Sequence, residues 1–341
     1  MVKKREDIEN LRAVAIILVV LGHSVILYSD KWALYPTTVS APPLNGLKDI
    51  INLIQMPLFF SISGFCLVYS LNGKRSFRGF LKNKLRRVVV PFLIIGALWL
   101  YPLRMLADYP AYQDVNPANV LVKYIYFGYD NGHLWFLPTL FLMLVLTDLI
   151  ARVPLFESKP SLFDLSLVAI ALLTVAIPVS WPYLGQFGQN YMWFVVGVLF
   201  HRHEKWIREV CTGGMKIVLV CAAGIGCLIT GCGIESMLLG KILSLICVLV
   251  AYLVVPNHST ATLRKISRNS MGIYLFHSPL IYLSFNFWPN ISPWLMVLIN
   301  FVGFGAVAYG MTELVRKLGL GIVIGAVSYT HLRAHETGRN L

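Results

Sequence analysis

The stretch NLRAVAIILVVLGHS, residues 10–24, is almost wholly apolar but carries Arg12 near one end and His23 near the other. In a helix, eleven residues at about 100° each place these two side chains on one face, about 16 Å apart along the axis. Charged and titratable groups are costly in hydrocarbon, so they usually face the interior of a bundle or a wet cavity. This stretch therefore predicts a membrane helix whose polar face lines a site.

The rest of the chain has the same apolar character. Of its 341 residues, 57% are hydrophobic and only 13% are charged, whereas soluble domains are about 25% charged. Apolar runs long enough to cross a hydrocarbon core of about 30 Å recur, and they are continuous rather than alternating. We therefore predict an all-α integral membrane protein with about ten transmembrane helices, at residues 8–28, 47–70, 88–106, 132–151, 162–180, 190–201, 215–233, 237–255, 270–287 and 293–314.

The formal net charge of +13 could indicate a nucleic-acid partner, but its distribution favours membrane topology. Most Lys and Arg residues fall in the segments that share the predicted side of the N-terminus. The opposite side carries only Lys31, Lys48, Arg104, Lys123 and Lys241. Positive residues mark the cytoplasmic side of membrane helices. Both termini are therefore predicted to be cytoplasmic, and no nucleic-acid partner is expected.

No metal site and no second domain are predicted. The six cysteines form no CxxC pair, and the group His201, His203 and Glu204 lies beside basic residues at a helix end, as interfacial clusters do. Residues 5–317 are expected to form one membrane domain. Residues 327–341 are polar and aperiodic. We interpret them as a non-native end, with a short cytoplasmic tail as the alternative, and assign them no function.

Five stretches, taken in order, resemble the acyltransferase-3 family of integral membrane O-acyltransferases. DIENLRAVAIILVVLGH, residues 7–23, resembles the first span of that family, in which Arg is followed by ten residues and His. Four later stretches resemble its other segments: MPLFFSISGFCL (56–67), FLKNKLRRVVVPF (80–92), HLWFLPTLF (133–141) and SMGIYLFHSPLI (270–281). The resemblance covers residues 5–317, and five ordered matches make it specific.

The resemblance implies a relay that takes an acyl group, by default acetyl, from cytoplasmic acyl-CoA and passes it to a hydroxyl of a carbohydrate or lipid-linked glycan. Acyl-CoA is then a donor substrate, and no bound cofactor is expected. His23 would be the general base that deprotonates the hydroxyl, although it could instead carry the acyl group itself. Arg12 would bind the donor or hold the charge geometry of the site. Arg86 and Arg87 lie where the CoA phosphates would arrive.

Four further residues are weaker candidates for substrate contact. Ser63 and His277 lie within predicted helices, where a hydroxyl or an imidazole can also serve as an interhelical hydrogen-bonding group. His133 and Trp135 open the fourth span, where Trp is either an ordinary interfacial residue or a platform for a sugar ring. Two carboxylates could orient a histidine, and the sequence does not choose between them: Asp130 and Glu313.

A polytopic secondary transporter or flippase is the main alternative, because it also needs buried charges and basic inner loops. Such a protein is expected to show related halves with broken helices at matching places, and no internal repeat is evident. A membrane scaffold would leave the shared face of Arg12 and His23 unexplained. The sequence therefore favours an enzyme surrounded by membrane lipid, in a membrane such as the bacterial inner membrane.

Overall fold

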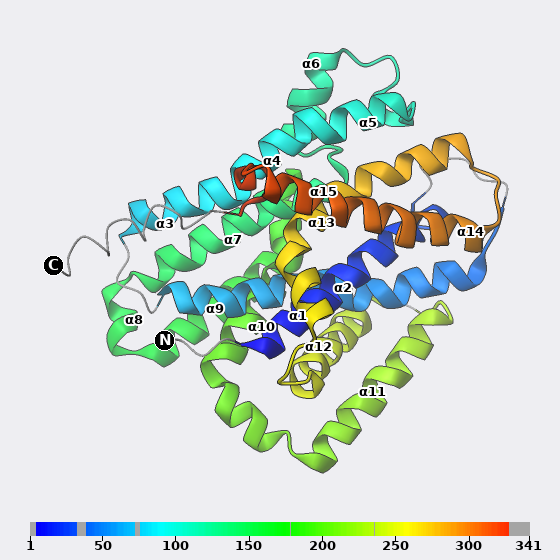
Figure 1. Cartoon of the computed structure of the whole chain (residues 1–341). Helices are drawn as coiled ribbons and strands as arrows, with labels where there is room; N and C mark the ends of the chain where they lie inside the picture. Colours follow the sequence, from blue (N-terminus) through cyan, green and yellow to red (C-terminus); the bar gives the residue numbers. More distant parts are fainter. Residues whose placement is uncertain (1–4, 33–38, 72–75, 178, 235, 327–341) are drawn as a thin grey trace.

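The computed structural model describes residues 5–32, 39–71, 76–177, 179–234 and 236–326, and every regular element within them is a helix (Figure 1). The predicted tail at 327–341 lies outside the described residues. The long helices without π-helical turns are α1 (Glu6–Ser24), α2 (Pro42–Leu71), α7 (Phe136–Ala151), α9 (Pro160–Ala176), α10 (Pro182–Val210), α11 (Gly213–Gly231), α12 (Met237–Val254) and α13 (Ala261–Phe287). Helix α10 is kinked at His203.

Two further helical segments contain π-helical turns. Phe77–Leu106 comprises α3 (Phe77–Lys84), α4 (Val90–Ile95) and α5 (Tyr101–Leu106), and Pro293–Lys317 comprises α14 (Pro293–Leu298) and α15 (Gly305–Lys317). The remaining elements are short: α6 (Pro117–Asn119), the π-helical segment Val120–Tyr126 that follows it, α8 (Pro154–Ser158) and several 3₁₀ turns.

A helix overlaps each predicted span, which confirms the all-helical fold class. Among the described residues, six segments are long and apolar enough to cross a membrane: Pro42–Leu71, Phe77–Leu106, Gly132–Ala151, Gly213–Gly231, Met237–Val254 and Pro293–Lys317. The chain is therefore an integral membrane protein. The total of ten spans and the cytoplasmic position of the termini stay predictions.

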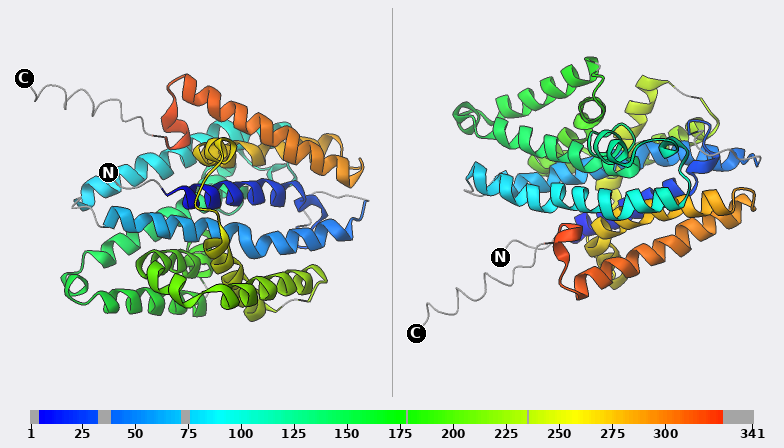
Figure 2. Two further views of the ribbon diagram at one scale, coloured as in Figure 1. Left: turned by 60° about the horizontal axis from the view of Figure 1, so that its bottom comes forward. Right: turned by 90° about the horizontal axis from the view of Figure 1, so that it is seen from above.

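Helices α1 and α13 are not among these six segments, and both pack in the interior. Figure 2 shows α1, in dark blue, running through the middle of the bundle between its neighbours. It packs against α2 and α13, and its Ile16 and Val19 are almost fully buried. A helix that other helices cover does not need to be apolar on every face, because little of it meets lipid. These two helices can therefore carry the polar groups of a site.

Backbones of α2 and α10 touch directly. A methyl group on Gly64 of α2 would collide with the backbone of Phe194, and one on Gly197 of α10 would collide with the backbone of Ser61. Small residues allow such close packing between membrane helices. The contact holds α2 firmly where its later turns line a cavity described below.

The Phe77–Leu106 segment contains π-helical turns at Leu85–Val89 and Gly96–Leu100. Each turn precedes a proline, at Pro91 and Pro102, which lacks a backbone N–H and crowds the preceding turn. Wider turns accommodate that loss of a hydrogen bond within a continuous helix. The turns determine where the segment presents two cations, Arg87 and Arg104.

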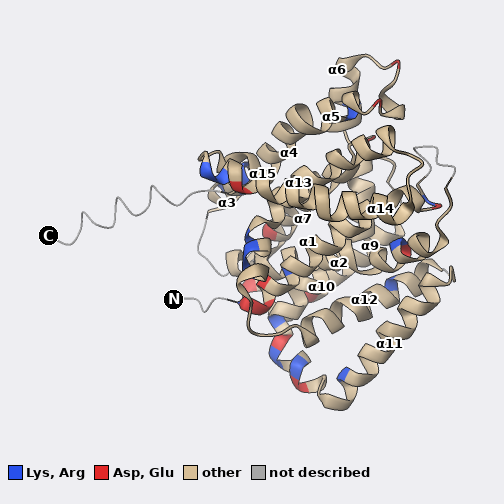
Figure 3. Ribbon diagram, turned by 45° about the vertical axis from the view of Figure 1, so that its right-hand side comes forward, with Lys and Arg blue, Asp and Glu red and all other residues tan. Residues whose placement is uncertain are grey.

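Charged side chains gather at one end of the bundle, which we call the basic end (Figure 3). Helix α1 begins there, and the Arg5 guanidinium lies 2.6 Å from Asp7 and 2.8 Å from Glu204 of α10. Burial opposes ionisation of both carboxyl groups, but the hydrogen bonds of Arg5 and the positive charges of Arg5 and Arg208 together outweigh burial, so the pKa of each carboxyl group lies below its ordinary value. These ion pairs tie the start of α1 to the end of α10.

Candidate active site

Three histidines meet near the end of α1 that lies away from the basic end. His23 Nδ1 lies 2.8 Å from His277 Nε2 of α13, and the two rings stack with centroids 5.0 Å apart. His133 lies in the 3₁₀ turn before α7, with its ring centroid 5.7 Å from that of His277 and 6.4 Å from that of His23. The structure thus brings together three residues that the sequence predicted from separate motifs.

Hydrogen bonds define the tautomers of the neutral His23–His277 pair. His277 Nδ1 lies 2.9 Å from the carbonyl oxygen of Ile273. A carbonyl can only accept, so Nδ1 of His277 carries the proton and its Nε2 is an acceptor. His23 must then donate through Nδ1 to His277. His23 Nε2 therefore keeps its lone pair, and it makes no hydrogen bond to the described residues, as a general base requires.

His23 and His133 line a cavity of about 200 Å³, which we call the histidine chamber. Trp135 lines it as well, together with Arg104 and Asp130. His133 Nδ1 is buried there without a hydrogen-bond partner among the described residues. The chamber is smaller than the 300–1,000 Å³ typical of sites for drug-sized ligands. It suits a small acyl group and a hydroxyl rather than a whole coenzyme.

Arg104 is a residue of the chamber that the sequence analysis assigned only to topology. Its side chain is fully buried. Nη1 donates to Tyr112 at 2.6 Å and to an Asp130 carboxylate oxygen at 3.1 Å, and Nη2 donates to Tyr282 at 2.8 Å. The guanidinium carbon lies 3.9 Å from the ring centroid of Tyr109. One sequence signal was present, a cation beside an aromatic loop, but it also fits an ordinary interfacial residue.

Neither carboxylate that could have oriented a histidine does so in the described structure. Asp130 pairs with Arg104, and Glu313 pairs with Arg268 at 3.0 Å. The backbone carbonyl of Ile273 instead begins the chain of hydrogen bonds that orients the imidazoles. A backbone acceptor of this kind has no signature in the amino-acid sequence.

A larger cavity of about 850 Å³ lies at the basic end, and we call it the basic cavity. Three of the candidate site residues, Arg12, Ser63 and Arg87, line it, whereas Arg86 is exposed and does not line it. Glu9 is the single acidic residue among the described residues of its lining. Five further cations line it: Lys84, Arg264, Lys265, Arg268 and Arg316. Positive charge is therefore in excess, which suits a ligand with several phosphates.

Arg12 and Ser63 differ in how far their hydrogen-bonding capacity is used. Arg12 Nη2 donates to Cys66 Sγ at 3.5 Å, which is a weak interaction, and Arg12 forms no ion pair within the described residues. Ser63 Oγ donates to the carbonyl of Phe59 in the preceding turn at 2.9 Å. The Arg12 fork can therefore bind an anion, while the Ser63 proton is already used by its own helix.

The two cavities lie at opposite ends of the same helices. On α13, Tyr274 lines the basic cavity, Ser278 lines the histidine chamber, and His277 lies between them in sequence. The consecutive residues Trp135 and Phe136 likewise line the chamber and the basic cavity, respectively. The Tyr274 hydroxyl donates to the backbone of the 3₁₀ turn before α7. Tyr274 and Phe136 therefore form part of a wall between the two cavities.

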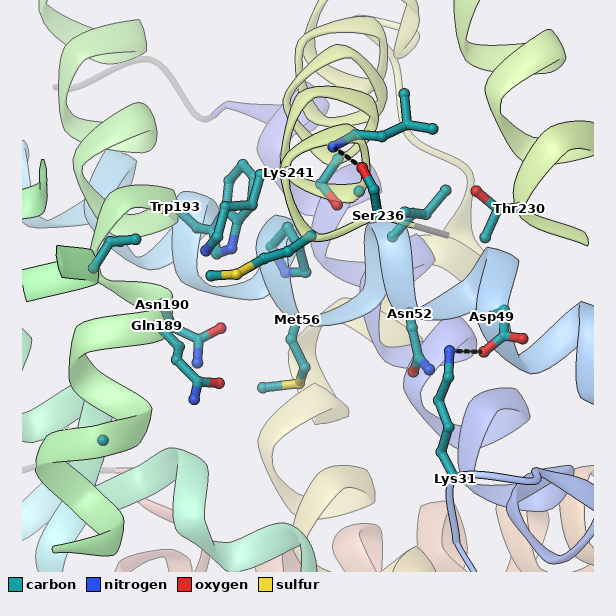
Figure 4. Close-up of a pocket in the computed structure, with 18 of the residues that line it drawn as sticks. Lys31, Asp49, Asn52, Met56, Gln189, Asn190, Trp193, Thr230, Ser236 and Lys241 are labelled. Carbon is teal, nitrogen blue, oxygen red and sulfur yellow. Dashed lines mark hydrogen bonds and ion pairs between the residues drawn. The ribbon is translucent and has the colours of Figure 1, made fainter. Parts of the chain in front are cut away.

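A third cavity, of about 920 Å³, lies among α2, α10 and α12, and we call it the amide pocket (Figure 4). The carboxamides of Asn52 and Asn190 line it, and so does the ion pair of Lys31 and Asp49, whose N–O distance is 2.8 Å. Trp32, the next residue after Lys31, lines the histidine chamber. The sequence did not predict this pocket, because its residues are ordinary polar side chains on separate segments.

Comparisons with known proteins agree with the motifs. A family model described as an acyltransferase domain matches residues 5–313, which is most of the chain. The curated proteins and the solved structures yield no match. The match covers nearly all of the predicted membrane domain, and it contains the histidine cluster, the five ordered motifs and most of the residues that line the basic cavity. The chain therefore belongs to the acyltransferase-3 family and is a membrane acyltransferase.

Proposed function

We propose that this protein transfers an acyl group, by default acetyl, from acyl-CoA in the basic cavity to a hydroxyl that enters the histidine chamber, with His23 as general base. The observation that carries this proposal is the hydrogen-bond chain from Ile273 through His277 to His23, which leaves His23 Nε2 as an acceptor beside the chamber. Family membership favours acyl transfer over the alternative of a transporter or flippase.

The basic cavity supports acyl-CoA as the donor. The phosphates of CoA are anionic, and the planar forks of Arg12 and Arg87 match phosphate geometry. From Arg12, α1 rises about 16 Å to His23, so the pantetheine arm would run along this helix toward the chamber. The wall that includes Tyr274 and Phe136 has to open for the thioester to meet the hydroxyl. Because cations mark the cytoplasmic side, the donor would come from the cytoplasm.

In the proposed reaction, the acceptor hydroxyl oxygen attacks the thioester carbonyl carbon while His23 Nε2 takes its proton. His277 accepts the hydrogen bond from His23 Nδ1 throughout and keeps the ring in place, as the third member of a catalytic triad does. The tetrahedral intermediate then expels the CoA thiolate, which takes the proton back from His23. The products are the ester and CoA, and His23 is neutral again. If His23 carried the acyl group, the same Nε2 would be the nucleophile.

The amide pocket supports a carbohydrate acceptor, free or lipid-linked. Carboxamides such as Asn52, Gln189 and Asn190 offer donors and acceptors that match sugar hydroxyls. Lys241 adds a cation, and its hydrogen-bond partner within the described part of the chain is the Met192 sulfur at 3.8 Å. A headgroup held there would lie beside the chamber, because adjacent residues line the two cavities. The inside-basic charge pattern suits a bacterial inner membrane.

A transfer assay with labelled acetyl-CoA in native membrane vesicles, where the acceptor is present, tests the proposal. His23→Gln keeps a hydrogen-bonding side chain but cannot act as a base, so the rate of transfer should fall about 10²–10⁴-fold while CoA binding is retained. His258→Gln is the matched control, since His258 is exposed at the basic end, and it should transfer at the wild-type rate. Near-normal transfer by His23→Gln would show that the proposed mechanism is wrong. Acyl-enzyme trapped on wild-type protein without acceptor, with the acyl group located on His23, would identify His23 as an acyl carrier.

A further inference from the structure

We infer that Arg104 binds the oxygen of the reacting carbonyl and stabilises the oxyanion that forms during acyl transfer. The inference rests on the proposed function and adds a catalytic residue to it. It concerns the part of the histidine chamber that is lined from α5, where Arg104 lies.

The first observation is an unsatisfied donor. The Arg104 side chain is 0% exposed and lines the histidine chamber with His23. Its Nε has no hydrogen-bond partner among the described residues, although Nη1 and Nη2 are well bonded. A buried N–H left unpaired is unfavourable, and native structures seldom keep one without a reason. An oxygen acceptor on the substrate would satisfy it.

The second observation is the balance of charge around the guanidinium. Asp130 lies 3.1 Å from Nη1 and offsets the positive charge. Burial raises the pKa of Tyr109 and of Tyr112, although Arg104 opposes this, so both phenols stay neutral. The cation is thus already compensated by one carboxylate, and the unmet requirement is a hydrogen bond rather than a counter-charge. A carbonyl oxygen that gains charge only in the transition state fits better than a permanent carboxylate.

The third observation is that the guanidinium is held in place before substrate arrives. Gly132 has a φ of +54°, and a Cβ there would lie 2.5 Å from Arg104 Nη2. Phenols from Tyr109, Tyr112 and Tyr282 surround the group. Donors that are fixed in advance need no reorganisation during the reaction, which is the basis of oxyanion stabilisation.

As the hydroxyl oxygen bonds to the thioester carbon, the carbonyl π electrons move onto the carbonyl oxygen, and Arg104 Nε–H donates to that oxygen. His23 Nε2 holds the proton from the hydroxyl. When the carbon–sulfur bond breaks, the electron pair re-forms the carbonyl, sulfur leaves as thiolate, and Arg104 keeps its proton throughout.

The test is the steady-state kinetics of Arg104→Lys in the vesicle assay. Lys keeps the charge but not the Nε donor or the planar fork. The value of kcat should fall about 10²–10³-fold, as for other oxyanion donors, with KM for acetyl-CoA unchanged. Lys123→Gln removes an exposed cation from a neighbouring segment and should leave kcat unchanged. In Arg104→Ala, added guanidinium ions should restore part of kcat, which a merely structural role would not allow.

Three results would each overturn the inference. The first is a kcat for Arg104→Lys within about fivefold of wild type, and the second is a rise in KM in place of a fall in kcat. The third is a folded Arg104→Ala whose kcat is not restored by added guanidinium ions. If Arg104→Ala does not fold, Gly132→Ala replaces it. The added methyl group displaces the guanidinium and keeps its charge, so kcat should fall, and a wild-type kcat would overturn the inference. Activity in His23→Gln would instead refute the proposed function, so the two failures can be told apart.

Discussion

The basic cavity and the histidine chamber lie along the same two helices but use polar groups in opposite ways. The basic cavity is large and lined by an excess of cations from several segments. The chamber is about a quarter of its size, and its buried cation is paired with a carboxylate. In the chamber, the hydrogen bonds that His277 and Arg104 make leave two atoms without a partner among the described residues: His23 Nε2 and Arg104 Nε.

This difference suits the basic cavity to binding the donor and the histidine chamber to the chemical step. Many partly exposed cations can hold a polyanion, and each one contributes a modest share because solvent screens it. A few buried groups, each with a defined tautomer or geometry, can instead stabilise a transition state. We therefore expect substitutions in the chamber to lower kcat strongly, and substitutions around the basic cavity to raise KM for the donor or to change little.

The largest effect tests the histidine pair. His277→Leu removes the acceptor for His23 Nδ1 and frees the imidazole to adopt the wrong tautomer or rotamer. We expect kcat to fall about 100-fold, within the range for loss of general-base catalysis, with KM for acetyl-CoA unchanged. His277→Gln offers an amide oxygen as a replacement acceptor and should recover part of the rate. Equal loss in both variants, or a matching rise in KM, would show that His277 is not a positioning residue.

A smaller effect is expected for Arg12, at the boundary between the two regions. Arg12→Lys keeps the charge and loses the fork that grips phosphate, so kcat/KM for acetyl-CoA should fall about tenfold, or about 1.4 kcal/mol. The matched control is Arg208→Lys, the same change at the basic end, where Arg208 pairs with Glu204 at 2.9 Å instead of lining the cavity. If both variants behave like wild type, Arg12 is only an interfacial anchor.

Adjacent arginines allow a sharper test of the basic cavity. Arg87 lines it, whereas Arg86 is exposed outside it. Arg87→Gln should raise KM for acetyl-CoA about fivefold through loss of one charge-assisted contact, and Arg86→Gln should leave KM within about twofold of wild type. Kinetics at two salt concentrations should show the larger salt dependence for wild type than for Arg87→Gln. If Arg86→Gln instead raised KM more than Arg87→Gln did, the donor would bind outside the basic cavity.

Sequence patterns predicted the all-helical membrane fold, because apolar runs of membrane length follow from the cost of polar groups in hydrocarbon. The orientation of the termini, which rests on the placement of cations, stays a prediction. Sequence patterns also predicted His23, His133 and His277, since an imidazole in an apolar run is conspicuous. Six of the ten predicted spans pass a test of length and apolar composition. Of the other four, α9 has only 17 residues, and α1, α10 and α13 carry too many polar residues to pass.

The rest of the site depends on tertiary contacts that no single segment reveals. Arg104 looked like a topological charge, and only the structure shows that Asp130 and three tyrosines surround it. Ile273 orients His277 through a backbone carbonyl, which any residue could supply. Arg86 and Arg87 look equivalent in sequence, but the helical turn places only Arg87 in the cavity.

The smallest effect concerns the ion pairs at the edge of the basic end, which are expected to stabilise the fold without serving the reaction. The pKa of Asp7 and of Glu204 lies below its ordinary value because Arg5 favours their ionised forms despite burial. Their contribution to stability is therefore fully present above the ordinary carboxyl pKa of about 4 and is lost as pH falls through the lowered values.

Arg5→Gln should accordingly melt about 1–3 °C below wild type at pH 7, since partly exposed ion pairs contribute up to about 1 kcal/mol each. This difference should shrink as pH falls below about 4, where protonation removes the same interaction from wild type. Melting in detergent at several pH values measures it, and kcat at pH 7 should stay at the wild-type value. A constant difference across pH would mean that Arg5 acts through its contact with the Phe65 ring, whose centroid lies 5.1 Å away. A fall in kcat at pH 7 would mean that these ion pairs also affect the reaction, because an ion pair that only stabilises the edge of the bundle should leave kcat unchanged.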